Sequence, residues 1–172
     1  MRASEAKPRT RHANPNPYFN HMAGLGGVYI VRAPLPIRCR AGRMELPPAV
    51  IVHGLGEARL ALAQGLPVTL LSAPGAACHA GCLWWHSLLR AARTPYPALL
   101  DCADSPGRAL EALRMGLKGI VLDCEAALFA AVADPARMHG ALLLSRAPPA
   151  LDLASRGAAR RLPAWLAGRA AS

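Results

Sequence analysis

Short runs of aliphatic residues recur along the middle of the chain. They are apolar at consecutive rather than alternate positions, which is typical of strands buried on both faces in a parallel sheet. The runs lie at Ala49–His53, Pro67–Ser72, Pro97–Cys102, Gly119–Cys124 and Ala141–Ser145. We predict a buried strand at each of them, and a further short strand at Val28–Arg32 in a region with no sustained periodicity.

Segments suited to helices separate these runs. We predict helices at Glu57–Gln64, Ala76–Arg93, Pro106–Met115 and Ala126–His139, and a last one, interrupted by Gly157 and Pro163, at about Ala150–Ala167. The sequence Asp104-Ser105-Pro106 predicts a helix cap followed by proline at the first helical position. Glycines fall where three of the helices should end, at Gly65, Gly116 and Gly140.

Strands that alternate with helices predict parallel pairing through right-handed crossovers. We therefore expect an α/β fold of about five strand–helix units around a parallel sheet. A flavodoxin-like or receiver-like three-layer sandwich is the first expectation, and a partial (β/α) barrel is the alternative.

The basic charge is concentrated outside this region. The whole chain carries +10, and residues 1–43 hold eight basic residues against Glu5 alone. Residues 155–172 hold four basic residues and no acid, whereas residues 44–154 hold eight basic and nine acidic residues. We predict a basic, disordered arm over 1–43, an α/β domain over 44–154 and a basic C-terminal helix or tail over 155–172. Because the domain is nearly neutral, specific nucleic-acid binding is disfavoured.

The five cysteines are an odd number in a chain without an evident secretory signal. No stretch reaches the ~20 uninterrupted apolar residues of a membrane-spanning helix. These features predict a cytoplasmic protein with reduced thiols and no membrane partner.

Polar side chains gather where the predicted strands end. In open α/β sheets and in barrels, ligands bind beyond the carboxyl ends of the strands. We expect Asp101, Asp123 and His53 to be the catalytic candidates, because carboxylates held close together can serve as acid and base. The ligand-binding candidates are Ser72, Asp104, Glu125, Ser145 and Arg146. Asp104 and Ser105 are also interpreted as helix caps, and Asp and Ser at a strand end often serve loop amides instead of a ligand.

Two local motifs suggest cofactor chemistry that the rest of their pattern does not support. In His53-Gly54-Leu55-Gly56 the glycines would let backbone amides approach an anion, but a dinucleotide fingerprint needs a third glycine where Arg59 stands. Cys78, His79, Cys82 and His86 have the residue types of a metal set but poor spacing on one helix, so we interpret them as part of an amphipathic helix. We predict no metal site, and the cofactor is unknown.

The segment LDCADSPGRALEALRMG (Leu100–Gly116), together with PPALDLA (Pro148–Ala154), resembles a group of short uncharacterised bacterial α/β proteins. That resemblance implies the domain limits and no activity. ALRMGLKGIVLD (Ala112–Asp123) is similar to a segment of small aldolases for 2-keto-3-deoxy sugar acids, but Lys118 precedes a strand and does not match their Schiff-base lysine. Asp101 resembles the phospho-acceptor of receiver domains, yet their paired acids and lysine are replaced by His53-Gly54 and Ser145-Arg146.

These observations predict a small-ligand-binding α/β domain, with enzymatic activity left open. In the enzymatic interpretation one carboxylate acts as a base and Arg146 holds a small anionic ligand. The rival hypothesis is a non-catalytic module for assembly, as a homo-oligomer, or for protein interaction. Its partner surface would be formed by Trp84, Trp85 and the apolar helix Cys82–Leu89.

Overall fold

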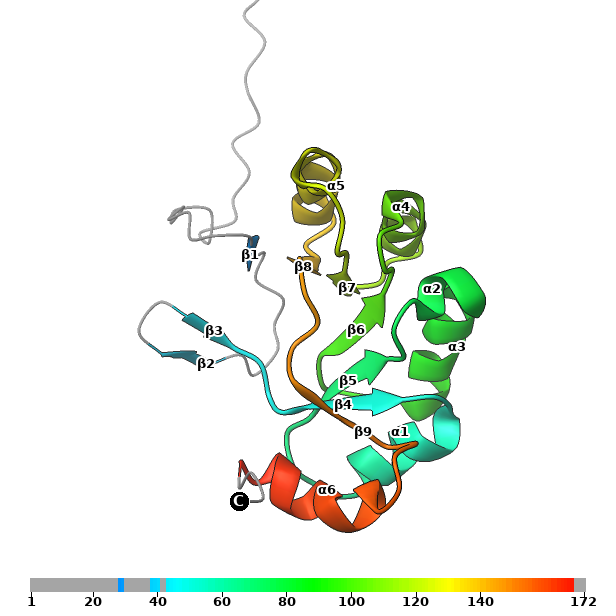
Figure 1. Ribbon diagram of the computed structural model, residues 1–172, viewed down its shortest axis with the longest axis vertical. Helices are drawn as coiled ribbons and strands as arrows, with labels where there is room; N and C mark the ends of the chain where they lie inside the picture. The colour runs from blue at the N-terminus through cyan, green and yellow to red at the C-terminus, as the bar shows by residue number, and fades with distance from the viewer. Residues whose placement is uncertain (1–27, 30–37, 41–42, 169–172) are drawn as a thin grey trace, which may run out of the picture.

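The computed structural model describes residues 28–29, 38–40 and 43–168, with side chains described from Leu46 to Gly168 (Figure 1). The strands are β1 (Val28–Tyr29), β2 (Arg38–Arg40), β3 (Arg43–Glu45), β4 (Ala49–Val52), β5 (Thr69–Ser72), β6 (Ala98–Asp101), β7 (Gly119–Val121), β8 (Leu142–Leu144) and β9 (Ala150–Asp152). The helices are α1 (Leu55–Leu62), α2 (Ala76–His79), α3 (Cys82–Ala92), α4 (Pro106–Arg114), α5 (Ala126–Met138) and α6 (Ala158–Leu166).

Six strands form one parallel sheet in the order β8-β7-β6-β5-β4-β9. β1 adds to the β8 edge in the antiparallel sense, and β2 and β3 pair with each other as a separate hairpin. Consecutive strands from β4 to β8 are neighbours, and the last strand, β9, returns to pair with β4. The predicted α/β class, the parallel sheet and the short strand near Val28 are confirmed.

The two faces of the sheet are packed differently. Successive strand residues alternate between two buried clusters, so that Leu70 and Leu100 face one side and Leu71 and Leu99 face the other. All the helix-borne core residues belong to the first cluster, whereas the second contains only residues of the strands and Leu46. The described helices therefore cover one face, as the partial (β/α) barrel would have them. This is what right-handed crossovers dictate when strands follow one another in sequence order.

The opposite face is crossed by the connection between β8 and β9. Residues 145–149 join the two outermost strands of the six, as Figure 1 shows in orange between β8 and β9. A right-handed crossover that leads back across the sheet from β8 to β9 has to pass over the face opposite the helices. Six Cα–Cα steps span at most about 20–22 Å, whereas six strands placed side by side in a flat sheet measure about 24 Å. The sheet must therefore curve or twist enough to bring its outermost strands within reach of this connection.

Two predicted helices differ from the structure. The helix expected at Ala76–Arg93 is divided into α2 and α3 by Gly81, whose φ of +86° is incompatible with a continuous helix. The helix expected from Ala150 is wrong over its first part, because Ala150–Asp152 form β9 and only Ala158–Leu166 are helical. Pairing with β4 fixes the extended conformation of Ala150–Asp152, and Pro149 restricts the preceding Pro148 to an extended conformation.

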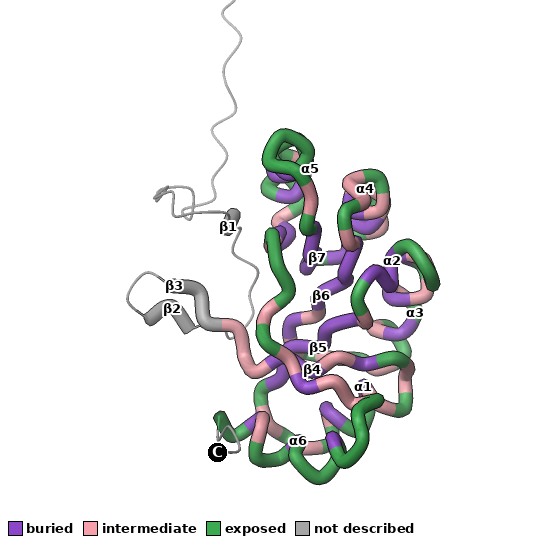
Figure 2. The backbone as a smooth tube through the Cα atoms, viewed as in Figure 1, coloured by how far each residue is buried: buried purple, intermediate pink, exposed green. Residues whose placement is uncertain are grey.

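The predicted helix ends are largely confirmed. Gly65, Gly116 and Gly140 have φ angles of +66°, +82° and +62° after their helices. Ser105 occupies the predicted cap position before Pro106, but its side chain makes no capping hydrogen bond, so that part of the prediction is wrong. Figure 2 shows α6 contributing buried positions, and Leu162 on this helix is fully buried in the main core cluster. The predicted basic arm, residues 1–43, lies mostly outside the described residues.

Candidate functional site

The carboxyl ends of the six parallel strands meet at one rim of the sheet, as the sequence predicts. His53 follows β4, Ser72 ends β5, Asp101 ends β6 and Asp123 follows β7. Ser145 follows β8, and Asp152 ends β9. Because the strand order places β9 beside β4, the polar residue at the end of the last strand lies next to His53.

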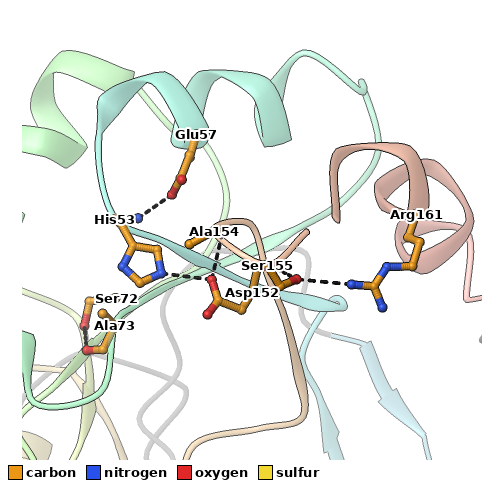
Figure 3. A network of polar contacts seen from close by, with 8 residues as sticks. All are labelled: His53, Glu57, Ser72, Ala73, Asp152, Ala154, Ser155 and Arg161. Carbon is orange, nitrogen blue, oxygen red and sulfur yellow. Dashed lines mark hydrogen bonds and ion pairs between the residues drawn. The ribbon is translucent and has the colours of Figure 1, made fainter. Parts of the chain in front are cut away.

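The central feature of this rim is a pair formed by His53 and Asp152 (Figure 3). Nε2 of His53 lies 2.9 Å from Oδ1 of Asp152, and the same oxygen accepts a 2.9 Å hydrogen bond from the Ala154 amide. The two side chains are 39% and 43% exposed, so a ligand in solution can reach both. The residues are 99 positions apart in the sequence and meet only because β4 and β9 pair.

The backbone around the pair is held from two helices. Oε2 of Glu57 in α1 accepts a 2.6 Å hydrogen bond from the His53 amide. The Ser155 hydroxyl donates to the Asp152 carbonyl at 2.6 Å, and Arg161 of α6 donates to that hydroxyl at 3.1 Å. Figure 3 shows these groups on either side of the pair. Supporting contacts of this kind restrict the orientation of the two reactive side chains.

The hydrogen bonds of the pair set the charge state of Asp152 and the tautomer of the His53 ring. Partial burial raises the pKa of Asp152, but the hydrogen bonds from His53 and from the Ala154 amide outweigh it and leave the pKa below its ordinary value of 3.8. Asp152 is therefore a carboxylate at neutral pH and can only accept hydrogen bonds. Nε2 of His53 must carry the proton that it donates, which leaves Nδ1 of the neutral ring as the basic nitrogen.

Asp101 is placed at the same rim but has a different role. It is 9% exposed, and its Oδ1 accepts 2.9 Å hydrogen bonds from the Gly75 and Ala103 amides. Its own amide donates to the Ser72 hydroxyl at 2.9 Å, and that hydroxyl donates to the Ala73 carbonyl. Asp101 and Ser72 thus fix the turns that follow β5 and β6, and both are largely shielded from a ligand.

A strained residue connects Asp101 to the next strand end. Ala103 has φ +49°, a left-handed conformation that is unfavourable for a residue with a Cβ. Its amide is held by Asp101, and its carbonyl accepts a 2.8 Å hydrogen bond from the Asp123 amide. Non-glycine residues in this conformation are enriched at functional sites, where the surroundings enforce them.

Asp104, Asp123 and Glu125 are exposed on this side of the rim. Desolvation raises the pKa of the nearby Cys124 thiol, and the charges of Asp123, Asp104 and Glu125 raise it further. No hydrogen bond or ion pair among the described side chains joins Asp101 to Asp123. The predicted pairing of these two carboxylates as acid and base therefore lacks a direct contact between them.

The remaining binding candidates are separated from the pair. Ser145 is exposed after β8. Arg146 lies on the β8–β9 connection and lines a hollow with Leu46, Pro47, Pro48, Ala49, Leu144, Pro148 and Pro149. The structure therefore assigns Arg146 to a different part of the surface from His53.

The cysteine and histidine cluster of the sequence is divided between two helices. Cys78 and His79 are exposed on α2, whereas Cys82 is buried at the start of α3. No group of three or more potential metal ligands comes together among the described side chains. Desolvation raises the pKa of the Cys102 thiol to about 12, with smaller contributions from Cys82 and Asp101, so this buried sulfur is not a nucleophile at neutral pH.

The surface predicted for protein interaction is smaller than expected. Trp85, Cys82 and Leu88 are buried in the main core, and Trp84 packs against it. Leu83 is exposed by 65% on the same helix. Assembly as a homo-oligomer stays a prediction. No helix in the described part of the chain has the length and apolar character needed to cross a lipid bilayer.

Asp152 is the functional candidate that sequence reasoning missed. A signal was present, because Leu151-Asp152 repeats the Leu-Asp pattern found at Leu100-Asp101 and Leu122-Asp123, where strands end. The pattern was hidden by the predicted helix over Ala150–Ala167. Comparison of the chain with family models, with curated proteins and with solved structures gave no match.

Proposed function

We propose that the protein binds a small anionic ligand at the rim beside α1, with His53 as a general acid–base group oriented by Asp152. The observation that carries this proposal is the 2.9 Å contact between His53 and Asp152 at the ends of two neighbouring parallel strands. A carboxylate that accepts from one imidazole nitrogen fixes the tautomer and leaves the other nitrogen to exchange protons with a ligand.

Apart from Glu57, whose carboxylate accepts a hydrogen bond from the His53 amide, the residues after His53 offer backbone amides to an anion. α1 begins at Leu55, and the amides of its first turn point out of the helix with the positive end of its dipole. A Cβ added at Gly54 or Gly56 would meet no atom within 4 Å, so there is open space directly over this backbone. An anion bound there would lie next to the imidazole of His53, and a small phosphate or carboxylate compound is the ligand class that fits.

The compartment proposed is the cytoplasm. The described cysteines, Cys78, Cys82, Cys102 and Cys124, are free thiols, which supports a reducing environment. The enzymatic version of the proposal assigns proton transfer at Nδ1 of His53 as the catalytic step.

Histidine-selective NMR with inorganic phosphate as the probe tests this function. We expect the His53 ring resonances to shift in a saturable manner, while those of His86, which lies on α3, remain unchanged. The His53→Gln variant should lose phosphate binding, and Asp152→Asn should weaken it. Equal shifts at His53 and His86, or full binding by His53→Gln, would contradict the proposal.

A further inference from the structure

The hollow beside Arg146 is separate from the His53–Asp152 pair. It lies between the segment that leads into β4 and the connection that joins β8 to β9. Leu46, Pro47, Pro48 and Ala49 line one side, and Leu144, Arg146, Pro148 and Pro149 line the other. It is open to solvent and has a volume of about 440 Å³, within the range of sites for small ligands. Leu46 and Leu144 also pack against the second buried cluster, so the wall of the hollow continues into the core of the sheet.

The hollow is rigid and has few polar groups. Four of its eight lining residues are prolines, which have a fixed φ and no amide proton. The carbonyl of Pro47 accepts a 2.8 Å hydrogen bond from the Thr69 hydroxyl, and that of Pro48 accepts one of 3.0 Å from the Thr69 amide. These two carbonyls are thus already engaged with β5. A ligand would meet a preformed apolar wall, which lowers the cost of ordering on binding.

Arg146 supplies the charge in this lining. It forms no ion pair with any acidic side chain between Leu46 and Gly168, where side chains are described, and its position is exposed. A guanidinium presents paired N–H donors that match the two oxygens of a carboxylate. Two leucines and four prolines around one guanidinium are complementary to an apolar body that carries a single negative group.

From this complementarity we propose that the hollow is a binding site for a small carboxylic acid with an aliphatic body, whose carboxylate pairs with Arg146 and whose chain contacts Leu46 and Leu144. This inference does not rest on the function proposed for the rim. The two sites are expected to respond to different substitutions.

Methyl and amide NMR of the whole chain with octanoate as the probe tests the site. We expect saturable shifts at the Leu46 and Leu144 methyl groups, and binding about tenfold weaker in Arg146→Gln, a loss in keeping with a solvent-exposed guanidinium–carboxylate pair. Arg156→Gln is the matched control, because Arg156 is also an exposed arginine but does not line the hollow. It should bind octanoate as the wild type does.

Uncharged octanol distinguishes a carboxylate site from a merely apolar surface. We expect octanol to bind at least about tenfold more weakly than octanoate to the wild type and to respond little to Arg146→Gln. Equal binding of the two probes, or shifts spread away from Leu46 and Leu144, would overturn the proposal. His53→Gln should leave octanoate binding intact. The proposal for the rim and the proposal for the hollow can therefore be rejected independently of each other.

Discussion

Asp101 and Asp152 share the same local structure but have different roles. Each ends a strand of the parallel sheet, and each accepts a 2.9 Å hydrogen bond at Oδ1 from the amide two residues further on. The second partner differs, being the Gly75 amide for Asp101 and the His53 imidazole for Asp152. The Asp101 carboxylate is buried and fixes turns, whereas the Asp152 carboxylate is exposed and orients the His53 ring.

Position in the sheet explains the difference. β6 lies in the interior of the sheet between β5 and β7, so the turns that follow its neighbours enclose Asp101. β9 is the outermost strand beside β4, and Asp152 has a neighbouring strand on one side only. A strand-end carboxylate is therefore available to a ligand according to its place in the strand order, which the local sequence does not reveal.

The largest effect is expected from removing the buried carboxylate. Asp101→Ala should lower the free energy of unfolding by about 2–4 kcal/mol, because the Gly75 and Ala103 amides lose their shared acceptor in a buried position. Asp123→Ala, at an exposed carboxylate one strand away, should change it by less than about 0.5 kcal/mol. Urea unfolding monitored by tryptophan fluorescence measures both. Similar losses in the two variants would show that Asp101 is not the structural carboxylate.

The exposed carboxylate should matter less for stability. Asp152→Ala is expected to cost about 0.5–1 kcal/mol at neutral pH, since its hydrogen bonds are partly solvent-exposed. The same unfolding measurement applies, with Asp134→Ala as a control at an exposed ion pair on α5. A loss as large as that of Asp101→Ala would remove the contrast between the two carboxylates.

The pH dependence of stability should also identify Asp152. Because its pKa is lower in the folded state, its contribution is complete above the ordinary pKa of 3.8 and is lost as the pH falls below that value through the lowered pKa. The wild type should therefore lose stability more steeply than Asp152→Asn in this acidic range. Parallel stability curves for the two proteins would contradict the pairing.

A substitution at the strained turn should stabilise the protein. Ala103→Gly removes the cost of a Cβ at φ +49°, and we expect a gain of about 0.5–1 kcal/mol after the larger entropy of the unfolded chain is included. Ala131→Gly, at an exposed position inside α5, should have the opposite sign and cost about 0.5–1 kcal/mol. If Ala103→Gly also destabilises, the turn is not strained in the folded protein.

Gly56→Ala is expected to change stability least of all these variants and yet to affect phosphate binding directly. Gly56→Ala places a methyl group in the open space over the first turn of α1 and should raise stability by a few tenths of a kcal/mol, because alanine is the better helix former. Phosphate binding at the rim should be lost in this variant if the anion approaches the backbone there. Retained phosphate binding would move the proposed ligand away from α1.

Much of the fold was accessible from the sequence, because buried parallel strands are recognisable as uninterrupted aliphatic runs. The strands predicted at Ala49–His53 and Pro97–Cys102 differ from β4 and β6 only at their ends. β9 was missed because a run as short as Ala150–Asp152 has no period of its own, and its conformation comes from pairing with β4. The break between α2 and α3 did have a local signal, because glycine is a poor helix former and Gly81 has a positive φ, but a single glycine does not by itself require a helix to end.

The sequence predicts at which edge of the sheet the polar residues gather, but it does not predict which of these residues contact one another. Parallel strands guarantee that His53, Ser72, Asp101 and Asp123 share one end of the sheet, and they do. Which carboxylate meets the imidazole depends on strand order, and the Leu151-Asp152 pattern marks the end of a strand without showing that this strand pairs with β4. The separation of Arg146 from His53 has the same origin, because it follows from the path of the β8–β9 connection.

The late return of β9 has a consequence for synthesis on the ribosome. β4 is the first strand of the parallel sheet to be made, yet one of its two hydrogen-bonding edges has no partner until Ala150–Asp152 have been translated. An unpaired strand edge favours association with other chains. Nascent chains that stop before residue 150 would expose this edge and should aggregate more than chains that extend through α6.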